Sequence, residues 1–208
     1  MAFARSLIAA AALAAAAPAF AVQSVTTTLS FDEPALQGYG VAVGHAYEAE
    51  GVLFSDSALV ISNDAAGTYY TNAPSMAGVM VVDTFSEAST TLSATSGRAF
   101  VEQVSFWYSS TVDLMPAVSV FSSSGQRLAG VGAVANVIDA GCSDSAACAW
   151  NKVTISFTGQ AQSIVFNGGA GAVAFDNITV SSVPEPESYA LMLAGLVGVG
   201  FLASRRRA

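Results

Sequence analysis

The chain has 208 residues, of which 53% are hydrophobic and 11% are charged, and its formal net charge is -8. This composition is too apolar for an intrinsically disordered protein, which lacks the hydrophobic residues needed to build a core. The chain also has only seven Lys and Arg, too few for the basic clusters with which nucleic-acid-binding proteins neutralise phosphates. We therefore expect a folded protein without a nucleic-acid partner.

Residues 1 to 21 have the three parts of a secretory signal peptide. A positive charge at Arg5 precedes an apolar run, and the small residues Ala19 and Ala21 follow that run. We predict a signal helix that is cleaved after Ala21. The alternative is an uncleaved membrane anchor, but the run is rich in Ala and short for a helix that spans a membrane.

Residues 22 to 183 are expected to form a single domain with one core. Apolar residues recur there mostly with a period of two, which is typical of strands with one buried face. Turn-forming Gly, Asn, Asp, Ser and Pro separate the predicted strands, which are 25–31, 51–54, 58–61, 79–85, 101–108, 118–121, 150–157, 163–166 and 173–180. With no convincing amphipathic helix, the pattern predicts an all-β fold, an antiparallel β-sandwich of jelly-roll type.

The last predicted strand changes phase part-way along. Val173 and Phe175 share one phase, whereas Ile178 and Val180 share the other. Because an inserted residue reverses the alternation of side chains between the two faces of a sheet, this predicts a β-bulge near Asp176.

The C-terminal part, residues 184 to 208, has three segments in order. Pro184, Glu185 and Pro186 come first, an apolar run from 189 to 203 follows, and Arg205, Arg206 and Arg207 come last. As a helix the apolar run would be roughly 22 Å long, somewhat short of a hydrocarbon core of about 30 Å. We expect a marginal transmembrane helix with a cytoplasmic C-terminus, because positive charges favour the cytoplasmic side.

This order of segments resembles the PEP-CTERM sorting signal of Gram-negative bacteria. The resemblance implies that an exosortase processes the chain at Pro184, Glu185 and Pro186. It also implies that the C-terminal helix holds the protein in the inner membrane until processing, and that the exported domain then reaches the cell surface or an exopolysaccharide matrix. A plain C-terminal membrane anchor is the alternative.

Two short stretches, around Phe175 and around Phe31, look like the terminal strands of galactose-binding-like jelly rolls found in PEP-CTERM proteins and carbohydrate-binding modules. In such jelly rolls a structural calcium often lies where the first and last strands meet. Here the resemblance implies Asp32 or Glu33 together with Asp176. The alternative is that Asp176 caps the bulge through local hydrogen bonds. We commit to no metal and no other cofactor.

Cys142 and Cys148 are the only cysteines of this exported chain. An oxidising compartment favours a disulfide bond between them. Closing a loop of about seven residues stabilises the fold by roughly 2.4 kcal/mol, so the bond would hold one loop and not the whole domain. A metal site is disfavoured because the chain has one histidine and no further thiol.

The sequence shows no catalytic constellation. His45 is the only histidine, and no G-x-S-x-G motif provides a serine nucleophile for it. Asp32, Glu33, Glu48 and Glu50 show no evident catalytic pairing, because sequence alone does not place two carboxylates in one cleft. We therefore predict that the protein is not an enzyme.

Tyrosines in loops give the main indication of a ligand. Tyr39, Tyr47, Tyr69 and Tyr70 lie in segments rich in Gly, Asn and Thr, where they can stack on sugar rings while Asn63, Asp64 and Asn72 bind hydroxyls. The alternative is that these tyrosines close the open ends of the sandwich. We predict a non-catalytic module that binds polysaccharide or another matrix component. A carbohydrate-active enzyme and a purely structural biofilm-matrix protein remain as alternatives.

Overall fold

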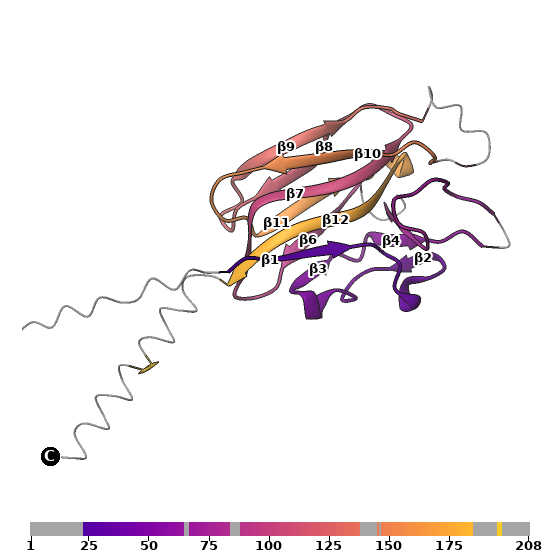
Figure 1. The fold of residues 1–208 in the computed structure, drawn as a ribbon. Helices are drawn as coiled ribbons and strands as arrows, with labels where there is room; N and C mark the ends of the chain where they lie inside the picture. Colours follow the sequence, from indigo (N-terminus) through magenta and orange to yellow (C-terminus); the bar gives the residue numbers. More distant parts are fainter. Residues whose placement is uncertain are drawn as a thin grey trace, which may run out of the picture.

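The computed structural model describes residues 23–64, 67–83, 88–137, 145, 147–184 and 195–196. Two antiparallel sheets pack face to face in these residues (Figure 1). The seven-stranded sheet has the order β10-β7-β12-β5-β4-β2, with β1 also paired to β12, and the five-stranded sheet has the order β3-β6-β11-β8-β9. The predicted antiparallel β-sandwich is therefore confirmed.

The strands of the seven-stranded sheet are β1 (Val25–Leu29), β2 (Tyr39–Ala42), β4 (Ala58–Ile61), β5 (Val79–Val82), β7 (Arg98–Ser110), β10 (Asn151–Ser156) and β12 (Val173–Pro184). Those of the five-stranded sheet are β3 (Val52–Phe54), β6 (Ser89–Ala94), β8 (Leu114–Phe121), β9 (Arg127–Ala133) and β11 (Ser163–Asn167). Three short 3-10 helices lie in the connections: η1 (Pro34–Leu36), η2 (Glu48–Glu50) and η3 (Gly169–Gly171).

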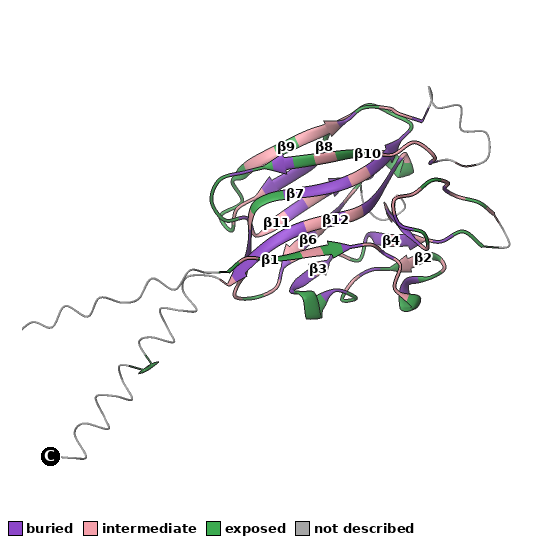
Figure 2. Cartoon of the chain, viewed as in Figure 1, coloured by how far each residue is buried: buried purple, intermediate pink, exposed green. Residues whose placement is uncertain are grey.

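The main core lies between the two sheets. Along β6 and β11 every second side chain is buried, as expected for strands with one face on a core. Phe106 and Phe175 of the seven-stranded sheet meet Phe166 of the five-stranded sheet in T-shaped contacts, with ring centroids 5.1 to 5.8 Å apart. This aromatic cluster joins the sheets, and all three rings are almost fully buried. Long stretches of β7 and β12 are buried (Figure 2).

Strand β12 is the central element of the seven-stranded sheet. It pairs with β7 along its length, while its other edge pairs first with β5 and then with β1. The register shifts between Asp176 and Thr179, and Asn177 has a φ of 46°, which confirms the predicted bulge. The bulge lies where the neighbour of β12 changes from β5 to β1.

The two ends of β12 lie at opposite ends of the sandwich. Val25 at the start of β1 pairs with Ser182, so both ends of the described domain lie together (Figure 1). Val173 lies 11 residues before Pro184, which at about 3.3 Å per residue separates them by roughly 36 Å. We call the end with Val25 and Pro184 the motif end and the other the distal end.

All nine predicted strands are present, and three strands were not predicted: β2, β6 and β9. Strand β9 contains two glycines and β6 four Ser and Thr residues, so their apolar alternation is weak. Both ends of the chain, including Ala19 and Ala21 and all but two residues of the apolar run 189–203, lie outside the described residues. Within the part of the chain that the structure describes, no helix is both long and apolar enough to span a membrane.

Candidate functional site

The outer face of the seven-stranded sheet is apolar where β4, β5 and β12 run side by side. Met80 and Phe175 point into the core, so their neighbours Val79, Val81 and Ala174 point to the opposite face. These residues form a second hydrophobic cluster together with Tyr70 and other loop residues: Tyr69, Ala73, Ala147 and Trp150. Loops, and not a second sheet, therefore cover this face.

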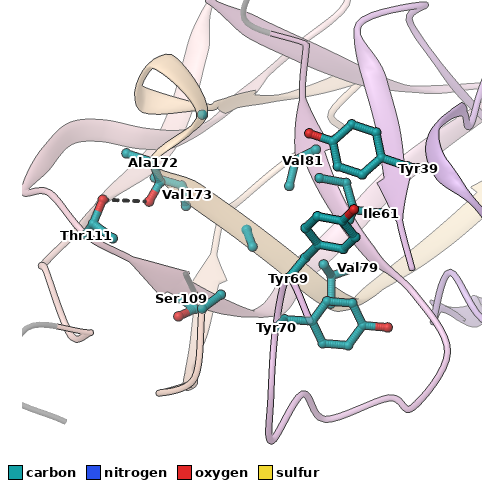
Figure 3. Close-up of a pocket in the computed structure, with 13 residues that line it drawn as sticks. Tyr39, Ile61, Tyr69, Tyr70, Val79, Val81, Ser109, Thr111, Ala172 and Val173 are labelled. Carbon is teal, nitrogen blue, oxygen red and sulfur yellow. Dashed lines mark hydrogen bonds between the residues drawn. The ribbon is translucent and has the colours of Figure 1, made fainter. Parts of the chain in front are cut away.

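The loops leave part of the face open as a depression of about 210 Å³ (Figure 3). Its floor is aliphatic and includes Ile61, Val79 and Val81. Tyr39 and Tyr69 form one wall, and the segment from Gly171 to Ala174 forms the other together with Thr111, whose Oγ1 donates to the carbonyl of Ala172 at 3.4 Å.

A second depression of about 210 Å³ continues the first. The two share four lining residues: Tyr39, Ile61, Val81 and Gly171. The second extends along Leu59 to Asp83. We call the two depressions together the tyrosine groove; they lie on the distal half of the sheet, next to the first residues of β12.

An aromatic pair stands at the rim of the groove. The ring centroids of Tyr39 and Tyr69 lie 4.9 Å apart with their planes tilted by 48°. Tyr39 is 65% exposed, which is high for an aromatic side chain on a strand. The sheet positions Tyr39 directly because it pairs with Ile61 of β4.

A strap between two distant segments holds the loop wall beside Tyr69. Trp150 Nε1 donates to the carbonyl of Thr71 at 3.0 Å, and the Thr71 amide donates to the carbonyl of Ala147 at 2.8 Å. The Thr71 hydroxyl also lies 3.0 Å from the hydroxyl of Ser145. These contacts join the 69–72 loop to the segment that contains Cys148.

The predicted polar ligand-binding residues instead stabilise the loop. Asn63 Oδ1 accepts the amides of Tyr69 and Tyr70 at 2.8 and 3.2 Å, and Asn63 Nδ2 donates to the carbonyl of Tyr70. Asn72 Nδ2 donates to the carbonyl of Cys148 at 3.5 Å, and Asp64 Oδ1 accepts the amide of Gly67. The amides of Asn63 and Asn72 thus fix the loop that carries Tyr69.

Three of the four predicted tyrosines line the groove, and Tyr47 does not. Tyr70 is buried, and its hydroxyl has no hydrogen-bond partner among the described residues. Tyr47 packs in the main core against Phe31, accepts the Phe31 amide at 2.8 Å and donates to Glu33 Oε2 at 2.5 Å. Burial and the hydrogen bond to Glu33 raise the pKa of Tyr47. The prediction that Tyr47 contacts a ligand is therefore corrected. Its hydroxyl is occupied by the Phe31 amide and the Glu33 carboxylate.

The carboxylates proposed for calcium lie around one loop. Asp176 accepts the amide and hydroxyl of Ser75 at 2.7 and 2.8 Å and the Asn177 amide at 2.6 Å. Asp32 Oδ1 accepts the amides of Ala77 and Gly78 at 2.7 and 3.2 Å. Within the described ranges, no three or more His, Cys, Asp or Glu residues are placed to share a metal ion. The hydrogen bonds of Asp176 fit its capping of the bulge, and the calcium that the resemblance implies is not tested by these contacts.

Burial dominates the electrostatics of Asp176. Its side chain is fully buried, which raises the pKa from its usual 3.8 to about 6, and the negative charge of Asp32 adds to this effect. The hydrogen bonds from Ser75 and Asn177 oppose it because they favour the ionised carboxylate. Asp176 therefore titrates within a mildly acidic range.

His45 and the remaining predicted residues lie elsewhere. His45 Nδ1 is 3.0 Å from Glu48 Oε2 on an exposed segment, and neither residue lines the groove. Cys142, Glu185, Pro186 and the arginines 205 to 207 lie outside the described residues, so the predicted disulfide stays a prediction. No free cysteine is found in the described ranges.

Strand β12 leads directly into the C-terminal segment, since Pro184 is its last residue. Residues 182–207 match the PEP-CTERM protein-sorting motif. This chain carries a PEP-CTERM sorting motif. The motif implies export, processing by an exosortase and sorting to the cell surface. Its first three residues, Ser182 to Pro184, belong to the sandwich.

Two solved structures resemble the sandwich distantly, and no curated protein matches the chain. The K2 cleaved adhesin domain of Lys-gingipain shares 12% identity over 75% of this chain and 99% of that domain, with a TM-score of 0.45. The Podospora anserina GH26-CBM35 β-(1,4)-mannanase shares 18% identity over 77% of this chain and 28% of that enzyme, with a TM-score of 0.37.

Proposed function

We propose that the protein is an exported, non-catalytic binding module that an exosortase sorts to the cell surface, where the tyrosine groove binds a glycan of the extracellular matrix. The observation that carries the proposal is the pair of the exposed Tyr39 and the half-buried Tyr69 beside an aliphatic floor. Aromatic rings stack on the apolar faces of sugar rings, and their hydroxyls reach the polar edge of the same sugar.

The position of the groove supports this role. The sorting motif leaves the sandwich at Pro184, whereas the groove adjoins Val173, roughly 36 Å away along β12. A domain that is held at a surface through its motif end therefore presents the groove away from that surface. The groove remains open to a polymer in the matrix while the protein is attached.

The lining of the groove favours binding over hydrolysis. Glycoside hydrolases act with two carboxyl groups on either side of the scissile bond. Among the described residues that line the groove, Asp83 is the sole carboxylic acid. His45, the only histidine, pairs with Glu48 outside it.

Binding is tested with the processed protein purified from the surface of the producing cell. Isothermal titration against the producer's own matrix polysaccharide should show saturable binding. Tyr39→Ala and Tyr69→Ala should each weaken it about tenfold or more, since truncating an aromatic residue that anchors a binding site costs about 2 kcal/mol or more. Met115→Ala is the matched control, because Met115 is 87% exposed and lies outside the groove.

The outcomes separate the proposal from its alternatives. Equal affinity of the tyrosine variants and the wild type would overturn binding in the groove. Release of shortened saccharides would favour a carbohydrate-active enzyme, and self-association without saturable binding would favour a structural matrix protein. Changing Pro184, Glu185 and Pro186 together to alanine should make the unprocessed form accumulate in the membrane, and normal processing of this variant would contradict the sorting role.

A further inference from the structure

Two of the tyrosines in the exported domain are accessible, and their rings lie together. Residues 22 to 183 contain five tyrosines: Tyr39, Tyr47, Tyr69, Tyr70 and Tyr108. Tyr47, Tyr70 and Tyr108 are at most 4% exposed, whereas Tyr39 is 65% exposed and Tyr69 is half-buried. The ring centroids of Tyr39 and Tyr69 lie 4.9 Å apart at the rim of the groove (Figure 3). The accessible phenols of the domain therefore form one pair, which we call the rim pair.

Two consecutive residues after β4 hold the rim pair in place. The Ser62 hydroxyl accepts the Gly38 amide at 3.2 Å, and the Ser62 amide donates to the Gly38 carbonyl at 2.9 Å, directly before Tyr39. Asn63 Oδ1 accepts the Tyr69 amide at 2.8 Å. Both backbones are thus fixed to the same end of β4, so the folded domain keeps the two rings together.

We propose that Tyr39 and Tyr69 are a modification site, at which a haem peroxidase and hydrogen peroxide form a dityrosine cross-link within one chain. Each tyrosine gives up one electron and the proton of its hydroxyl, which leaves two phenoxyl radicals. The radicals couple through one carbon ortho to each hydroxyl, and the hydrogen on each of these carbons moves to the phenolic oxygen, which restores both aromatic rings. Hydrogen peroxide takes up the two electrons and two protons and is reduced to two molecules of water.

The structure favours this product over a link between two chains. The two rings of one chain are already neighbours, whereas rings of different chains must first meet by diffusion. Thirteen Asp and Glu against three Lys and Arg in residues 22 to 183 also make two copies repel each other. Because Tyr39 is mostly exposed, its ring can turn toward Tyr69 and form the bond without displacing the core.

The cross-link should stabilise the domain. It joins β2, at the edge of its sheet, to the 69–72 loop across about 30 residues of chain. A covalent link of this kind restricts the unfolded chain, as a disulfide bond does. The midpoint of thermal unfolding should therefore rise by about 5 °C or more after oxidation.

The test treats the processed protein with a haem peroxidase and hydrogen peroxide. The monomer should gain the fluorescence of dityrosine, with a yield that does not depend on protein concentration. Proteolysis after glutamate separates the two tyrosines, because Glu48 and Glu50 lie between them in the sequence. In the oxidised protein the two peptides should stay joined with the loss of two hydrogen atoms, and mass-spectrometric fragmentation identifies Tyr39 and Tyr69 as the linked residues.

Three variants assign the link to the rim pair. Tyr39→Phe and Tyr69→Phe should each abolish it and the shift of the unfolding midpoint, because phenylalanine forms no phenoxyl radical. Tyr70→Phe is the matched control, since it removes the buried phenol next to Tyr69 in the sequence and should leave the yield of the link unchanged. Absence of the link from the folded wild type, its persistence in Tyr39→Phe, or products between chains alone would overturn the proposal. None of these readouts uses a glycan, so they stand apart from the test of glycan binding.

Discussion

The two hydrophobic clusters of this domain contrast in what covers them. The main core lies between two sheets, and its aromatic centre of Phe106, Phe166 and Phe175 is sealed on both sides. The second cluster lies on the outer face of one sheet, under loops that leave Tyr39 exposed and a groove open. Strand β12 contributes to both, with Phe175 facing the core and Ala174 facing the loops.

This contrast separates stability from recognition. Residues between the sheets are surrounded by apolar groups from every direction, so their loss leaves a cavity. The rim residues Tyr39 and Tyr69 keep part of their surface in water, so truncating them removes ligand contacts at little cost to folding. The following predictions test how far this separation holds.

Phe175→Ala should have the largest effect, because it leaves a cavity in the centre of the core. The expected loss is about 3 to 5 kcal/mol of unfolding free energy, measured by urea denaturation. Ala174→Gly, one residue earlier but on the groove face, is the control and should cost far less. A similar loss in the two variants would contradict the distinction between the two faces of β12.

Asp176, under the loop at the border of the second cluster, should make stability depend on pH. Its folded pKa of about 6 lies above its usual 3.8, so the folded state holds the proton more tightly than the unfolded state. The stabilisation from this proton is fully present below pH 4 and is lost as the pH rises through 6. The difference corresponds to about 3 kcal/mol.

The measurement for Asp176 is a series of denaturation curves from pH 4 to pH 7. The wild type should lose about 2.4 kcal/mol more than Asp176→Asn over this range, because the amide does not titrate and a small part of the effect already lies below pH 4. Parallel curves for the two proteins would contradict a raised pKa of Asp176 in the folded state.

Tyr47 and Tyr39 show the same contrast for one residue type. Tyr47→Phe should cost about 1 to 3 kcal/mol, because it leaves the buried amide of Phe31 without its acceptor. Tyr39→Phe should change stability by less than about 0.5 kcal/mol, since Tyr39 is largely exposed. Thermal denaturation of both variants measures the difference, and equal midpoints would contradict the assignment of Tyr47 to the core.

The sequence predicted the sandwich well because alternation encodes which face of a strand is buried. It also predicted the bulge at Asp176, since the phase change from Phe175 to Ile178 is visible in the residues themselves. Strands β2, β6 and β9 were missed because Gly, Ser and Thr contribute little to an apolar pattern. Strand β6 also takes its place between β3 and β11, which are not its neighbours in the sequence.

The groove was predicted only in part, because burial separates residues that look alike in sequence. Tyr47 and Tyr69 both lie in polar loop sequences, yet one satisfies the Phe31 amide and the other forms the rim of the groove. The aliphatic floor also went unrecognised. Val79 and Val81 alternate with core residues, and this was the available signal that β5 is apolar on both faces.

The strap that joins Trp150 to the 69–72 loop should show the smallest effect on stability and a distinct effect on binding. Trp150→Phe removes the hydrogen bond to the Thr71 carbonyl while keeping an aromatic ring, and should cost about 0.5 to 1.5 kcal/mol. Thr71 lies two residues after Tyr69, so loss of this hydrogen bond gives the Tyr69 loop more freedom to move. Ligand binding must then order the loop, which costs free energy and weakens the affinity. Glycan affinity should therefore fall even where the protein is fully folded, as measured by titration well below the unfolding midpoint. Unchanged affinity alongside the lower stability would show that the sheet alone positions the rim.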